Sequence, residues 1–166
     1  SYSTVDVLVD VLGWFPTGGS FNGLTPARLM DTRGGGTFDG AFSGGSKVVA
    51  GTDFNLTIAG RGGVPSSGVG SVALNVTAIN PAAAGFITVW PKGQPRPNAS
   101  NLNFVVGQIV PNMVIVALGA DGQISLWSYS TVDVLVDVLG WFPTGGSFNG
   151  LTPARLMDTR PPPGSV

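Results

Sequence analysis

Valine occupies every second position of residues 5–12, and Asp or Leu occupies the positions between. Because successive side chains of a β-strand point to opposite faces, this pattern predicts a strand with one buried face. The same pattern returns near the other end of the chain. The two sets of valines are Val5, Val7, Val9 and Val11, and Val132, Val134, Val136 and Val138.

Further β-rich runs, bounded by Gly, Pro or Asn, predict additional strands. They cover residues 47–58, 69–79, 86–90, 102–110 and 113–118. Ala-Asp-Gly at 120–122 lies between two apolar runs and predicts a hairpin turn. No segment shows helical periodicity. With about eight strands, the chain is expected to form an all-β, antiparallel β-sandwich, either Ig-like or jelly-roll-like. A closed β-barrel or a trefoil-like fold is the alternative.

Residues 1–33 are identical to residues 128–160, so the chain carries one segment twice, 127 positions apart. Convergence on a fold cannot produce such identity. The duplication indicates either a recent copy in a tandem array or a chain designed to carry one segment at both ends. In either case we interpret the chain as a little more than one period of a repeat. Residues 1–23 are expected to be the terminal strand and flexible linker of a preceding repeat, and residues 24–146 one complete sandwich. Residues 147–166 are expected to be a linker, the start of the next repeat and a Pro-rich tail.

A folded unit has one place for each strand, so one copy of the valine strand is spare. That copy can fray, displace its twin or be donated to a neighbouring molecule. Burial of four valines stabilises the strand by roughly 6 to 12 kcal/mol. Ordering about eight residues costs roughly 1 to 2 kcal/mol of conformational entropy each, so the two contributions nearly cancel. We therefore expect the spare copy to become ordered only where a complete groove receives it, and we expect other copies of the chain, or adjacent repeats, as partners.

Glycine (26) and proline (13) are abundant and charged residues make up only 10%, which fits short strands joined by turns. The net charge of −1 comes from scattered single charges, so nucleic acid is not an expected partner. No run approaches 18 apolar residues, and no signal-peptide pattern opens the chain, so membrane insertion is not expected.

The absence of His, Cys and Glu leaves little for catalysis, so no enzyme activity and no cofactor are expected. Asp6 and Asp10 are about 13 Å apart on a strand, too far to share a metal ion. We interpret them as charges that protect a strand edge. Arg28, Asp31 and Arg33 are expected to form a structural ion cluster rather than a catalytic site.

Trp90 and Trp127 are the candidates for a sugar-binding platform, because carbohydrates stack on exposed aromatic faces. In a sandwich, however, aromatic side chains are more often part of the core. A carbohydrate-binding or adhesive module, with a glycan as partner, is therefore the alternative function. Buried tryptophan rings would favour a structural role, and an exposed coplanar pair would favour sugar binding.

Several motifs occur in one order along the chain. They are LTPARLMDTR at 24–33, GRGGVP at 60–65, LNVT at 74–77, GFITVWP at 85–91, RPNASNLN at 96–103 and VDVLGWF at 136–142. In these motifs the chain resembles a tandem β-rich repeat of large secreted proteins from actinobacteria and Chloroflexi. The resemblance implies a secreted or cell-surface location and no catalytic residue. Together with the duplication, it predicts a structural repeat of a surface or filament protein that assembles head-to-tail, with donation of the duplicated strand as one route.

Overall fold

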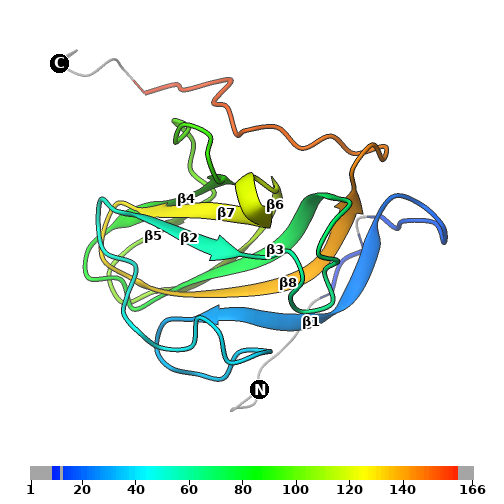
Figure 1. The fold of residues 1–166 in the computed structure, drawn as a ribbon. Helices are drawn as coiled ribbons and strands as arrows, with labels where there is room; N and C mark the ends of the chain where they lie inside the picture. Colours follow the sequence, from blue (N-terminus) through cyan, green and yellow to red (C-terminus); the bar gives the residue numbers. More distant parts are fainter. Residues whose placement is uncertain (1–8, 12, 161–166) are drawn as a thin grey trace.

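Two antiparallel four-stranded sheets pack face to face in the computed structural model, which describes residues 9–11 and 13–160 (Figure 1). The first sheet has the order β1-β8-β3-β6, and the second has the order β2-β7-β4-β5. This confirms the predicted all-β sandwich. The strands are β1 (Asn22–Asp31), β2 (Asp53–Thr57), β3 (Val69–Ile79), β4 (Gly85–Pro91), β5 (Leu102–Phe104), β6 (Ile109–Ala117), β7 (Gln123–Ser128) and β8 (Asp133–Pro143).

The two halves of the chain pair with each other in reverse order. β1 pairs with β8, β2 with β7, β3 with β6 and β4 with β5. The chain is thus one long hairpin rolled into two sheets, which is the strand order of a jelly roll and not of an immunoglobulin-like sandwich. The described residues form no closed barrel. The first and last strands are antiparallel neighbours, so the start of β1 lies beside the end of β8.

The core lies between the two sheets and consists mainly of Val, Leu and Ile side chains. Val132, directly before β8, and Val134, Val136 and Val138 within it lie on the inner face, and all four are fully buried. The period-two pattern therefore predicted the buried face of this strand correctly. Because β8 lies between β1 and β3, its backbone is hydrogen-bonded on both sides.

Two local predictions need correction. The turn at Ala120–Gly122 forms, but as a single 3-10 turn that leads from one sheet into the other. β6 pairs with β3, and β7 pairs with β2 and β4, so the predicted hairpin is wrong. β6 also continues through Pro111, which lies between the predicted strands at 102–110 and 113–118. An edge strand tolerates proline because only one side of it must be hydrogen-bonded.

Residues 22–31 form a strand that the alternation of apolar residues does not reveal. Its pairing with β8 shifts register twice, between Gly23 and Ala27 and between Arg28 and Met30. Each shift changes which side chains face the core, and the period of two is lost. The sandwich therefore begins at Asn22 rather than at residue 24.

Arg61 fastens the loop after β1 to the body of the sandwich. Its guanidinium group donates to both carboxylate oxygens of Asp39, at 2.7 and 2.8 Å, and to the carbonyl oxygens of Leu29 and Thr57, both at 2.8 Å. It also lies over the ring of Phe42, 4.9 Å from the centroid. Such a charge-assisted, two-pronged pair positions the loop firmly.

This pair predicts an acid-sensitive fold. The hydrogen bonds from Arg61 lower the pKa of Asp39 from 3.8 to about 2. A carboxyl group whose pKa is lowered by folding stabilises the native state above its unfolded pKa, and that contribution is lost as the pH falls through its folded pKa. We expect the urea midpoint to fall more steeply between pH 4 and pH 2 in the natural chain than in Asp39→Asn. Parallel pH profiles of the two chains would contradict this.

Candidate assembly site: the two copies of the repeated segment

The β8 position, which we call the strand slot, is filled by the second copy of the repeated segment. The slot lies between β1 and β3, and its four valines face the core. In the first copy, Val9 is 83% exposed and Val11 is 85% exposed. Val5 and Val7 lie outside the described residues. Val9 and Val11 are therefore solvent-exposed, whereas their counterparts Val136 and Val138 belong to the core.

The outward-facing aspartates of β8 do not guard a free edge. Asp137 accepts hydrogen bonds from Arg28 Nε at 2.8 Å and from its Nη2 at 3.2 Å. Asp133 accepts from Thr32 Oγ1 at 2.9 Å and pairs with Lys47 Nζ at 3.1 Å. In this copy the aspartates bind β1 and the loop that follows it, and the edge-protection interpretation of Asp6 and Asp10 stays a prediction. Of their counterparts in the first copy, Asp10 is exposed and Asp6 lies outside the described residues.

The structure brings Arg28, Asp31 and Arg33 together at the end of β1. The Arg33 guanidinium donates to both Asp31 oxygens at 3.1 Å, and Arg28 Nη1 lies 3.7 Å from Asp31 Oδ2. The hydrogen bonds from Arg33 lower the pKa of Asp31, although burial opposes the shift. The cluster is a local clamp, and the lowered pKa keeps Asp31 ionised at neutral pH.

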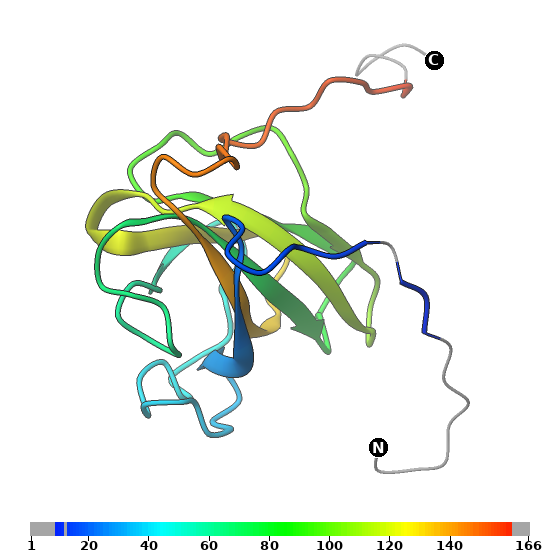
Figure 2. The ribbon, with the colours of Figure 1, turned by 90° about the vertical axis from the view of Figure 1, so that its right-hand side faces the viewer.

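The second copy of this run forms the same clamp in a different setting. Arg160 Nε lies 2.8 Å from Asp158 Oδ1, and Arg155 Nη1 lies 3.2 Å from Asp158 Oδ2. The run nevertheless lies outside the two sheets, as the orange and red trace of Figure 2 shows, beside Asn98, Ser100 and Asn103. Leu156 is 97% exposed. Its counterpart Leu29 is fully buried. The clamp is thus intrinsic to the segment, whereas burial depends on pairing with β8.

Trp90 and Trp127 do not form an exposed platform. Residues 92–101 fold over the outer face of β4, and the Trp90 indole N–H donates to the carbonyl oxygen of Gln94 at 2.9 Å. The Arg96 guanidinium lies over the ring of Trp127, 3.9 Å from the centroid. Trp90 is only 2% exposed and Trp127 only 9% exposed. Buried rings are the arrangement expected for a structural role.

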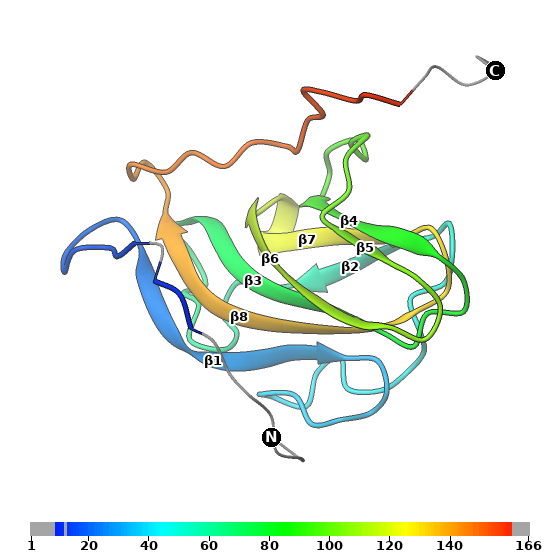
Figure 3. The same ribbon diagram turned by 180° about the vertical axis from the view of Figure 1, so that it is seen from behind.

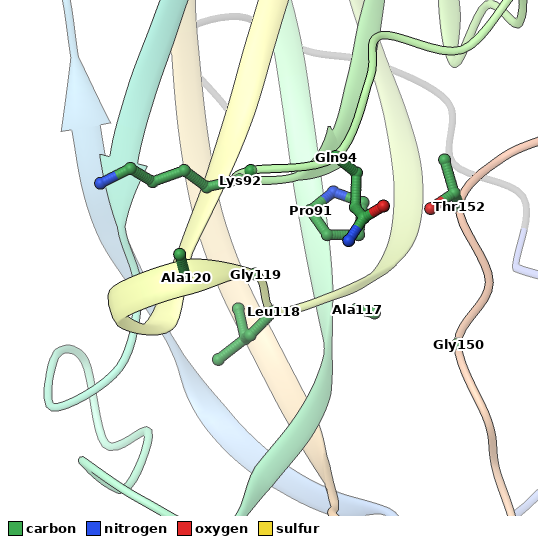
Figure 4. A pocket seen from close by; sticks show the side chains of 10 residues that line it. Pro91, Lys92, Gln94, Ala117, Leu118, Gly119, Ala120, Gly150 and Thr152 are labelled. Atoms are coloured by element: carbon green, nitrogen blue, oxygen red, sulfur yellow. The ribbon is translucent and has the colours of Figure 1, made fainter.

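The described residues offer no obvious catalytic centre. A pocket of about 500 Å³ lies between Gln94, the end of β6 and the C-terminal segment at Thr152 (Figure 4). Its charged side chain, Lys92, extends away from Gln94 and pairs with Asp121 at 3.1 Å. Within residues 9–11 and 13–160, no three metal-ligating side chains are grouped, and no helix is long and apolar enough to cross a membrane.

No family model and no curated protein matches the chain. The difference between the two copies is therefore established by the burial and contacts of their residues.

The sequence patterns did not identify four phenylalanines at and after the ends of the two repeated strands. A signal was present, because a Phe flanks each side of the Pro-Thr-Gly-Gly-Ser turn in both copies. These residues are Phe15, Phe21, Phe142 and Phe148.

Proposed function

We propose that the chain is a structural repeat of an extracellular surface or filament protein, in which neighbouring units are completed by exchange of the repeated strand. One observation carries the proposal. An identical sequence is fully buried in the strand slot in one copy and exposed at Val9 and Val11 in the other. Each molecule therefore offers a strand that fits a slot which every other molecule also contains.

Exchange at the slot is favoured over simple addition of a strand to the same sheet. At one edge of that sheet, the loop after β1 covers the end of the strand, where the Asp31 N–H donates to the Phe42 carbonyl oxygen at 3.0 Å. At the other edge, Pro111 interrupts the row of N–H donors of β6. Both features hinder pairing of an added strand. A donated copy gains most by replacing β8. There its valine side chains would enter the core, and its backbone would pair with both β1 and β3.

The charges around the slot fit a copy from either end of the chain. Arg28 holds Asp137 in the resident copy, and Asp10 stands at the same position of the other copy. An incoming first copy would therefore bring the carboxylate that Arg28 requires. It would leave no buried charge without a partner, which is the usual penalty for an imperfect replacement.

The solution mass tests this function. We expect the full chain to form concentration-dependent oligomers, measured by light scattering and negative-stain microscopy. A chain lacking residues 1–13 should be monomeric, because it has lost the spare strand but keeps β1 and the linker. If both chains are monomeric at every concentration, the assembly proposal fails. A glycan-binding screen would then test the adhesive alternative.

A further inference from the structure

The segments that follow the two repeated strands fold in the same way. We call residues 15–21 the first linker and residues 142–148 the second linker. In each, a glycine N–H donates to the carbonyl oxygen of the proline three residues earlier, at 3.0 Å for Gly19 and 3.2 Å for Gly146. The glycine before it has a positive φ, 77° at Gly18 and 73° at Gly145, as a type II turn requires. Both linkers therefore contain the same turn.

Aromatic packing within each linker is also alike. The ring centroids of Phe15 and Phe21 are 4.6 Å apart, and those of Phe142 and Phe148 are 4.5 Å apart. One linker precedes a strand and the other follows one, so their surroundings differ. The shared conformation therefore belongs to the segment itself.

The two linkers contact each other at equivalent positions. The hydroxyl groups of Ser20 and Ser147, which are 127 positions apart, are hydrogen-bonded. The Phe142 ring of the second linker packs against the first linker, with its centroid 5.0 Å from that of Phe21 and 6.2 Å from that of Phe15. Such ring pairs contribute about 0.5 to 1.5 kcal/mol each beyond the burial of their area. The contact is thus a specific pairing of two copies of one segment.

The Phe21 ring packs directly on the backbone of Gly140. A Cβ atom at Gly140 would lie 2.4 Å from the Phe21 ring, closer than any real contact allows. Gly13 occupies the same position in the first copy, and a Cβ atom there would meet nothing within 4 Å. A Cβ atom at Gly140 would also lie 2.8 Å from the Asn22 carbonyl oxygen, so the glycine is required where the first linker and the start of β1 pack on it.

The topology explains why the linkers meet. β1 and β8 are antiparallel partners, with Asn22 opposite Trp141. The chain consequently enters β1 and leaves β8 at the same corner of the sandwich (Figure 3). In a tandem array, every unit would be entered and left at that corner, and the preceding linker would lie beside the following one.

We propose that the linker is a self-recognition surface whose partner is a second copy of the same linker. This inference rests on the proposed function as a repeat. In an array, paired linkers form the junction at each unit, and each sandwich projects to one side of it. The distance between consecutive units along the array is then determined by the linker pair and not by the length of the sandwich.

Cysteine crosslinking of the full chain tests the pairing, because the natural chain contains no cysteine. In Ser20→Cys/Ser147→Cys, mild oxidation should give an intramolecular disulfide, seen as a monomer two hydrogens lighter by intact mass. Adding Phe21→Ala or Gly140→Ala should slow its formation by about tenfold, the equivalent of about 1.4 kcal/mol. Gly13→Ala, the matched control, should leave the rate unchanged.

Two results would overturn the inference: crosslinks only between molecules, or equal slowing by Gly13→Ala and Gly140→Ala. A urea midpoint measured for each variant separates loss of pairing from loss of folding. The crosslink depends on the linkers alone and does not require strand exchange. A crosslink in a chain that stays monomeric would therefore support linker pairing without strand exchange. Oligomers without the crosslink would support strand exchange without linker pairing.

Discussion

Val136→Asp should leave the chain folded, whereas Val9→Asp/Val136→Asp should unfold it. Val136 is fully buried in the strand slot. A carboxylate there, with no partner, costs on the order of 4 kcal/mol or more, a large part of the 5 to 15 kcal/mol that stabilises a typical domain. The single variant still carries an intact copy of the strand around Val9, whereas the double variant has none.

The chain can accommodate this replacement without changing the core. Asn22 pairs with Trp141, so the first copy would place Trp14 opposite Asn22, joined by the seven residues of the first linker. A loop of that length closes easily, because loop-closure entropy grows slowly with length. We expect Val136→Asp to lose only about 1 to 2 kcal/mol, mainly from the rearranged linker contacts.

Chemical denaturation of four chains measures the effect: the natural chain, each single variant and the double variant. Val9→Asp is the control and should match the natural chain, because Val9 is exposed. Light scattering then shows whether the slot is filled from the same molecule or from a neighbour. If Val136→Asp is as unstable as the double variant, the first copy cannot fill the slot and the strand-exchange proposal is refuted.

Leu29→Ala should destabilise the fold by about 2 to 5 kcal/mol, and Leu156→Ala should change it by less than about 0.5 kcal/mol. The two leucines occupy the same position of identical segments. Leu29 is fully buried, and Leu156 is almost fully exposed. Removing buried methyl groups loses transfer free energy and leaves a cavity, whereas removing exposed ones does neither.

Here the second copy should not rescue the first. The residues after Arg160 diverge from those after Arg33, so they supply neither Asp39 for Arg61 nor Phe42 for the core. Placing the 149–158 segment beside β8 would forfeit those contacts. Thermal unfolding of both variants tests the asymmetry. Equal melting temperatures for Leu29→Ala and Leu156→Ala would show that the β1 position can also be refilled.

Much of the fold is encoded in local patterns. The alternation at Val132–Val138 predicted the strand and its buried face correctly, because one side of β8 meets the core. The β-rich run at 69–79 likewise predicted β3 (Val69–Ile79) correctly. β1 was not recognised, since its register shifts break the period. The pairing of β6 and β7 was also out of reach, because a turn signal shows where the chain bends and not which sheet it enters next.

The candidate site is harder to predict for a different reason. Val9 and Val136, or Gly13 and Gly140, have identical neighbours in the sequence, so no local pattern can separate them. Their environments differ only through long-range pairing. Burial of Trp90 likewise depends on residues 92–101 folding back over the sheet.

The antiparallel partnership of the first and last strands also determines how a unit responds to force. Pulling on the two linkers would load the contact between Ser20 and Ser147 first, and then the Asn22–Trp141 end of the β1–β8 ladder. From that end, the hydrogen bonds of an antiparallel pair open one after another, like a zipper, and do not resist together in shear. An array of such units would yield gradually under tension and close again strand by strand, as an extensible tether rather than a rigid rod.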